Sequence, residues 1–189
     1  MKDFKLVKWL LGKGANPGVI SPSGDTPLSF AVTLSSVNII KLLISANNRY
    51  NQDLGTGELV HRAVKRCGKE RNLEVLNTLI RAGAPVDDIL WDQSPAYDTK
   101  AHFRRGTPLH EACKYGYPDV ADMLITNGAD PNKQKTQYRR PAGETPYEIA
   151  AMKNDTVMLE VMQRHVPEPS LLYKLGHGTV NGVSGSGQE

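Results

Sequence analysis

Cysteine is scarce in this sequence, with two residues among 189. Cys67 and Cys113 stand far apart and form no Cys-x-x-Cys pair, so neither a disulfide framework nor a zinc site is indicated. We expect both side chains to be buried in the core as small apolar thiols.

Long apolar runs and an apparent secretory signal are also missing. No stretch approaches the roughly 20 apolar residues that a transmembrane helix needs. Charged residues interrupt the N-terminal region where the apolar part of a signal would lie, at Lys2, Asp3, Lys5 and Lys8. We therefore expect an intracellular protein, cytoplasmic or nuclear, without a membrane span.

Aromatic residues and net charge are low as well. Aromatics make up 6% of the residues, against 39% for all hydrophobic types, which favours helices packed through Leu, Ile, Val and Ala. The formal net charge of +3 is too small to identify a partner by itself. No His-Glu-x-x-His, Gly-x-Ser-x-Gly, Walker-type loop or carboxylate cluster with metal-ligand spacing occurs, so we expect no catalytic site, no cofactor and no metal.

What the sequence does contain is a well-marked helical unit over residues 105–132. Thr107 and Pro108 are suited to the N-cap and the first position of a helix. Gly116 can end that short helix, and a second apolar-periodic helix follows over residues 119–125 before turn residues break the pattern. A helix pair of this size cannot bury its own apolar face, so it needs copies of itself alongside.

Copies are present in a consistent order. The helix start TPLHEA of residues 107–112 recurs as TPLSFA at 26–31, as ELVHRA at 58–63 and as TPYEIA at 145–150. The ends of the second helices recur too, as LLGKGANP, LLISANNRYN, LIRAGAPVD and LITNGADPN. Thr-Pro-Leu-His-x-Ala at a period of about 33 is the ankyrin signature, and residues 4–166 resemble the ankyrin-repeat family. The resemblance implies an all-α helical repeat solenoid of about four and a half repeats with extended loop fingers.

The resemblance also divides the chain. We expect a repeat domain over residues 1–175 and a flexible Gly/Ser-rich tail over residues 176–189. The first unit contains only a second helix, with Leu6, Val7, Leu10 and Leu11 facing inward, so either the array begins in a larger protein or its N-terminal cap is irregular. The repeats fall at residues 4–18, 22–53, 54–88, 103–134 and 141–166, followed by a short capping segment.

Two connecting segments depart from the repeat. The first, residues 87–105, is a long insertion that carries Trp91 and Phe103, which either fold back to pin the loop or contact a partner. The second, residues 133–140, has four cations and no acid. It is either a solvated loop tip or an anion-binding element, in which Tyr138 beside Arg139 would stack on a base.

His110 beside Glu111, with Cys113 nearby, is the closest approach to a catalytic group. His110 and His61 both occupy the histidine position of the repeat pattern. We therefore expect His110 to hydrogen-bond neighbouring backbone at a repeat junction rather than to act as a catalyst.

The resemblance implies a non-catalytic protein–protein interaction module that binds its partner on the concave first-helix face and the loop fingers. On that face we expect Phe30 and Ile149 to be exposed, with lysines and Arg66 making its middle positive. The alternatives are a regulatory or substrate-recruiting segment of a larger enzyme, or nucleic-acid or anionic-surface binding through residues 133–140. We expect a monomer that binds an acidic protein partner. If copies of the chain contact each other, we expect the contact at the uncapped N-terminal end. The predicted partner-binding residues are Trp91, Phe103, Arg104, Tyr115, Tyr138 and Arg139.

Overall fold

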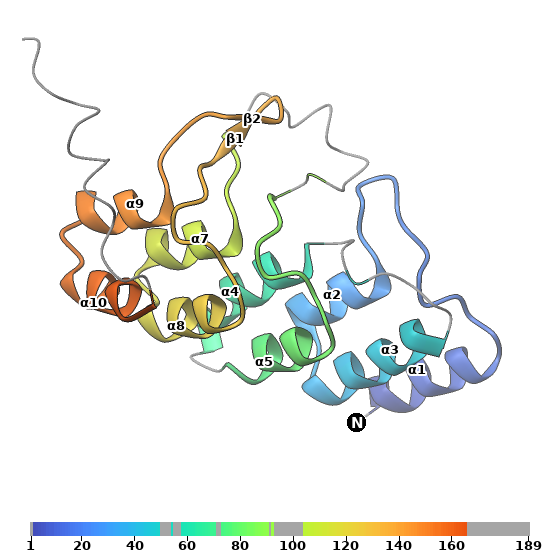
Figure 1. The fold of residues 1–189 in the computed structure, drawn as a ribbon. Helices are drawn as coiled ribbons and strands as arrows, with labels where there is room; N and C mark the ends of the chain where they lie inside the picture. The colour runs from blue at the N-terminus through green and yellow to red at the C-terminus, as the bar shows by residue number, and fades with distance from the viewer. Residues whose placement is uncertain are drawn as a thin grey trace, which may run out of the picture.

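The computed structural model describes residues 2–49, 54, 58–70, 73–90, 92 and 104–165, and its helices form two rows (Figure 1). The first helices of the repeats make one row: α2 (Pro27–Leu34), α4 (Leu59–Glu70), α7 (Pro108–Tyr115) and α9 (Pro146–Met152). The second helices make the other row: α1 (Lys2–Gly12), α3 (Val37–Arg49), α5 (Glu74–Arg81), α8 (Pro118–Thr126) and α10 (Thr156–His165).

Contacts between neighbouring repeats hold each row together. In the first row, α4 packs against α2 on one side and α7 on the other, and α7 packs against α9. In the second row, α3 lies between α1 and α5, and α8 packs against α10. This stacking confirms the predicted helical solenoid, in which a repeat contacts only its neighbours.

The repeated Thr-Pro pairs start the first helices through reciprocal capping. The Thr26 hydroxyl accepts a hydrogen bond from the backbone N–H of Ser29 at 3.1 Å, and Ser29 Oγ accepts one from the Thr26 N–H at 2.9 Å. Thr145 and Glu148 repeat the arrangement at 3.1 and 2.7 Å. Each pair satisfies two backbone donors that the first turn of a helix would otherwise leave without partners.

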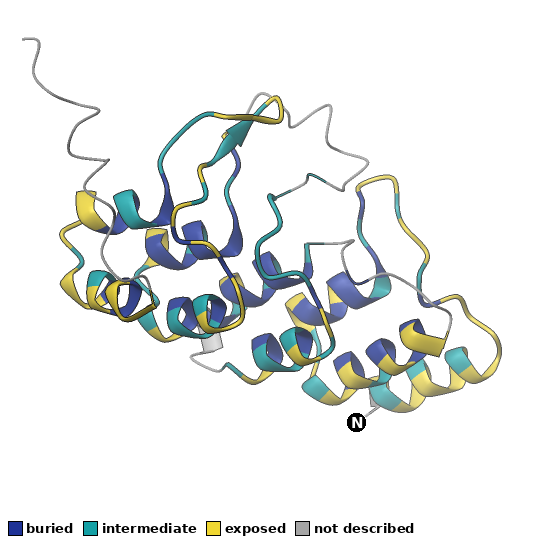
Figure 2. Cartoon of the chain, in the orientation of Figure 1, coloured by how far each residue is buried: buried dark blue, intermediate teal, exposed yellow. Residues whose placement is uncertain are grey.

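The core lies between the two rows, where buried residues of first and second helices face each other (Figure 2). Leu109 of α7 and Leu124 of α8 are both fully buried there. The alanine that ends the repeated six-residue motif is buried in every copy, and its small side chain lets neighbouring helices approach closely: Ala31, Ala63, Ala112 and Ala150.

Helix α1 faces differently from the prediction. Phe4, Val7 and Leu11 pack on the core, but Leu6 and Leu10 are exposed, so the inward assignment of these two leucines was wrong. Among the described elements, α1 packs chiefly against α3, which covers only one side of the helix.

Two helices are longer than their counterparts in the other described repeats. α3 continues past Ile44 through Asn47, whose side chain is buried, and ends at Arg49. α4 continues through Glu70, so the residues after Cys67 lengthen the first helix instead of forming a separate connection. A lengthened helix keeps its backbone groups paired, which an irregular insertion at that position would not.

The segment after α8 forms a β-hairpin instead of an irregular loop. β1 (Thr136–Gln137) pairs antiparallel with β2 (Arg140–Pro141). Arg105 adds a bridge to Thr136, with its N–H and carbonyl bonded to the Thr136 backbone at 2.8 and 2.7 Å. This unit, residues 133–144 with the chain at 104–106, projects beyond the first-helix row and is called the finger below (Figure 1).

Candidate functional site

The two histidines of the repeat pattern lie at junctions between repeats. The His110 ring accepts a hydrogen bond at Nδ1 from the Thr107 N–H at 2.9 Å, and its Nε2 lies 3.0 Å from the carbonyl oxygen of Glu144 in the next repeat. His61 reaches the Gly106 carbonyl in the same way, at 3.2 Å. Gly106 and Glu144 each precede the N-cap position of the following repeat, so the two contacts are equivalent.

Burial lowers the pKa of both histidines, to about 3 for His61 and about 4 for His110, which keeps the rings neutral near pH 7. A neutral ring with both nitrogens bonded to backbone is a structural group. The expected junction role of His110 is confirmed.

The two thiols are buried, as predicted. Burial raises the pKa of Cys113 to about 12, so it carries no thiolate near pH 7 and is unreactive. In the part of the chain that the structure describes, no group of three His, Cys, Asp or Glu side chains is placed to hold a metal ion. None of the described helices is long and apolar enough to cross a membrane.

The first-helix face consists of the residues around the repeated alanines on α2, α4, α7 and α9. Its cations bind within the fold. Arg66 donates to the carbonyls of Val32 and Ser35 at 2.9 and 2.7 Å, which completes the end of α2. Lys153 donates to the carbonyls of Cys113 and Lys114 at 3.0 and 2.9 Å, which does the same for α7.

Two further cations of α4 are paired with acids of neighbouring repeats. Arg62 binds Asp25 of the preceding repeat, and Lys65 lies 3.2 Å from Glu111 of the following one. Burial raises the pKa of Glu111 above its usual range. Of the cations predicted to make the middle of the face positive, Lys65 thus faces an acid, whereas Arg66 and Lys153 bind backbone carbonyls. These contacts link successive repeats.

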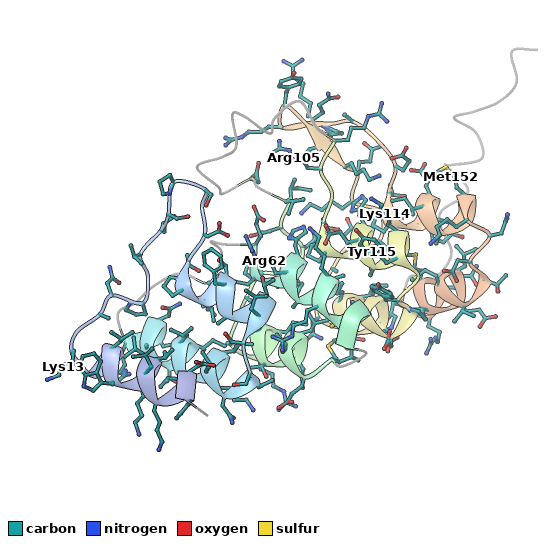
Figure 3. All side chains as sticks on the ribbon, turned by 180° about the vertical axis from the view of Figure 1, so that it is seen from behind. Lys13, Arg62, Arg105, Lys114, Tyr115 and Met152 are labelled. Atoms are coloured by element: carbon teal, nitrogen blue, oxygen red, sulfur yellow. The ribbon has the colours of Figure 1, made fainter. Side chains whose placement is uncertain are left out.

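Large apolar side chains remain exposed on the first-helix face. Phe30 and Leu34 on α2 are 53% and 80% exposed, and Tyr115 on α7 and Met152 on α9 are 46% and 65% exposed. Figure 3 shows Tyr115 and Lys114 on α7 and Met152 on the adjoining α9. Ile149, in contrast, is buried at 8%, so its predicted exposure was wrong, because it packs into the core of the last repeat.

The tip of the finger is a two-residue turn formed by Tyr138 and Arg139. Their φ angles are 50° and 59°, in the left-handed region that L-residues other than Gly, Asn and Asp seldom adopt. Two consecutive positive φ values in a two-residue hairpin are typical of a type I′ turn, for which Asn-Gly is the favoured sequence. Both side chains are exposed, Tyr138 at 61% and Arg139 at 63%.

Ion pairs brace the finger from its base to its tip. Lys133 lies 2.8 Å from Asp87, and Lys135 lies 3.0 Å from Glu144. Nearer the surface, Glu144 also faces Arg104 at 3.9 Å. Three of the four cations in residues 133–140 thus face acids outside that segment, since Asp92 lies 3.8 Å from Arg139.

Of the predicted partner-binding residues, Arg104, Tyr138 and Arg139 lie on the same finger. Tyr115 lies apart from them at the end of α7, where its ring stacks on Tyr117 at 5.8 Å. Trp91, Phe103, the capping segment and the tail lie outside the described residues. The prediction overlooked Leu34 and Met152. Leu34 stands three positions after a repeated alanine, as Tyr115 does, so its spacing would have placed it on the same face as Tyr115.

Comparison with known proteins identifies the family. A model described as ankyrin repeats in three copies matches residues 1–89, and a single ankyrin-repeat model matches residues 106–136. The chain belongs to the ankyrin-repeat family. Ankyrin repeats and the names of similar proteins indicate a protein–protein interaction module, and the family is generally non-catalytic.

Similar curated proteins are ankyrin-repeat proteins and a phosphatase regulator. The chain is 30% identical to a putative ankyrin repeat-containing protein of Treponema pallidum (strain Nichols), covering 75% of this chain and 41% of that protein. It is 27% identical to human ankyrin repeat and SOCS box protein 16, covering 78% and 38%. It is 39% identical to human protein phosphatase 1 regulatory subunit 27 over 31% of this chain and 30% of that one. The chain therefore spans less than half the length of these relatives.

Proposed function

We propose that this ankyrin-repeat array is a non-catalytic module that binds a protein partner across its first-helix face and its finger. The observation that carries the proposal is the exposure of Phe30, Leu34, Tyr115 and Met152 on helices whose core-facing residues, such as Leu28, Leu109 and Ile149, are buried. Leu34 and Tyr115 occupy the same position of their repeats, three residues after the repeated alanine. Exposed apolar side chains contribute little to stacking, and exposed apolar surface is typical of interaction sites.

The proposed contact residues include those that the sequence indicated. Tyr and Arg are enriched among the residues that contribute most to binding, which supports Tyr115, Tyr138, Arg104 and Arg139, together with Trp91 and Phe103 of the insertion. We propose an intracellular, monomeric module over residues 1–175.

A second function has specific support. One relative is named as a regulatory subunit of protein phosphatase 1, and the chain spans only part of each relative described above. The same binding surface would then recruit a substrate or regulate an enzyme within a larger protein. The captured partner distinguishes the two cases, since an enzyme or its substrate is expected only in the second.

The proposal is tested by quantitative capture from an extract of cells that naturally contain this protein. A Tyr115→Ala/Met152→Ala variant should lose at least about tenfold of a specifically captured protein, because removing two interface anchors typically costs more than about 1.4 kcal/mol of binding. Val157→Ala is the matched control, since Val157 is an equally exposed apolar residue on a second helix, α10. If the variant and the control capture the same proteins in the same amounts, the proposed surface is wrong.

A further inference from the structure

The finger tip keeps two residues that its turn disfavours. Tyr138 and Arg139 both hold positive φ, although Asn-Gly would adopt this turn without strain. Neither side chain contributes to the core, because both are largely exposed. Backbone strain of this kind, when the surrounding structure maintains it, is found at functional sites. In the finger, the Lys133–Asp87 and Lys135–Glu144 ion pairs at the base hold the hairpin that carries this turn.

The charges of the finger are layered. Arg104 and Arg139 are 60% and 63% exposed, whereas the acids that face them, Glu144 and Asp92, are 35% and 36% exposed. Arg140, next to the tip, is exposed as well. Among these described charged groups, the arginines are therefore more exposed than the acids that face them.

We propose that this tip, formed by Tyr138, Arg139, Arg140 and Arg104, binds an acidic surface of a protein partner. The inference deepens the proposed function and rests on it. Arginine matches carboxylates with a planar fork of donors. The Arg139–Asp92 and Arg104–Glu144 ion pairs, at 3.8 and 3.9 Å, are longer than direct charge-assisted hydrogen bonds, so a partner carboxylate can make a closer contact. The exposed Tyr138 ring supplies an apolar contact at the centre of these charges.

The same arrangement disfavours a nucleic acid. A polyphosphate backbone is bound by a continuous track of cations and by several stacking rings. Here Asp92 and Glu144 interrupt the arginines, and Tyr138 is the aromatic side chain of the hairpin tip. Separate carboxylates on a protein surface can approach each arginine without meeting these two acids.

A turn-optimised variant separates binding from folding. Tyr138→Asn/Arg139→Gly removes both proposed contacts and gives the turn its favoured residues, so its melting temperature should equal or exceed that of the unmodified protein. A benzophenone attached to an added cysteine, Pro141→Cys, would report what lies at the tip during irradiation in an extract of the source cells. Labelling is selective because Cys67 and Cys113 are buried.

The expected result is crosslinking to protein segments of net negative charge, with at least a tenfold lower yield when Tyr138→Asn/Arg139→Gly is also present. Arg139→Glu, which keeps Tyr138, should lower the crosslinking yield by a similar factor. It replaces the double variant in the test if that variant does not fold. Any of four results would overturn the inference. They are crosslinks that nuclease removes, crosslinks only to a second copy of this chain, crosslinks to segments without net negative charge, and an unchanged yield in the tip variants. If the tip variants crosslink normally while Tyr115→Ala/Met152→Ala still loses its captured partner, the finger tip is not the binding site and the proposed function stands.

Discussion

Individual polar residues in this array mostly connect one repeat to the next. His61 and His110 bond to the backbone of the following repeat, and Lys153 completes the end of the preceding first helix. Because the histidines are buried and neutral, the folded chain resists protonating them. Junction contacts of this kind make the stability of the stack depend on pH.

The first prediction concerns that pH dependence. The folded pKa values of His61 and His110 lie below the ordinary value of 6.5, so the unfolded chain binds protons first as pH falls. Their contribution to stability is present above pH 6.5 and is lost progressively toward pH 4. Each histidine should lower the free energy of unfolding by up to about 1.4 kcal/mol per pH unit.

Urea unfolding at pH 7 and pH 5 measures this effect. A His61→Gln/His110→Gln variant should be less stable at pH 7 and should show a smaller loss between the two pH values. The comparison stops at pH 5 because most carboxyl groups titrate below it. Burial raises the pKa values of Glu58 and Glu111, so protonation of these two groups stabilises the folded chain as pH falls, opposite to the effect of the histidines. An equally steep loss in the variant would show that other groups dominate.

At the scale of the helix, the sequence was most informative where its chemistry is local. Thr26-Pro27 and Thr145-Pro146 indicated where helices start, and the capping contacts explain why. Gly116, with φ of 71°, ends α7 in the left-handed conformation that the sequence suggested.

Other features depend on tertiary contacts and could not be predicted. The hairpin went unnoticed because Tyr138-Arg139 is not a hairpin turn sequence, and its pairing with Arg105 comes from a distant segment. Ile149 becomes buried through packing that a one-repeat pattern does not specify. The positive charge of residues 133–140 is visible in the sequence, but the acids that face Lys133, Lys135 and Arg139 lie outside that segment and come together with it only in the fold.

The second prediction tests the packing of α7 and α8. Leu109→Ala or Leu124→Ala should each lower the free energy of unfolding by about 2–5 kcal/mol, because both side chains are fully buried and truncation leaves a cavity. Leu34→Ala is the control, since Leu34 is 80% exposed, and it should change stability by less than about 0.5 kcal/mol. Chemical denaturation checks this, and similar losses for buried and exposed leucines would contradict the assigned core.

On the scale of the whole molecule, the stack closes across its long insertion. The Leu90 N–H donates to the Gly106 carbonyl at 3.0 Å, and His61 bonds to the same carbonyl. α4 packs on α7 directly. The contacts that join the repeats here come from residues on either side of 93–103.

The third prediction follows from that closure. Replacing residues 93–103 with a short Gly-Ser linker should change the free energy of unfolding by less than about 1 kcal/mol, because loop-closure entropy depends weakly on length. If the insertion contributes to binding, capture of the partner should fall while the melting temperature stays the same. A large drop in melting temperature would show that the insertion is part of the fold.

The central claim is that side chains displayed by the stack, and not the stack itself, bind a protein. It is tested most directly by measuring the dissociation constant of one captured partner for the intact chain, Tyr115→Ala/Met152→Ala and Val157→Ala, with the melting temperature of each. The prediction is at least about tenfold weaker binding for the double variant alone, with closely similar melting temperatures. Equal dissociation constants for all three proteins would contradict it.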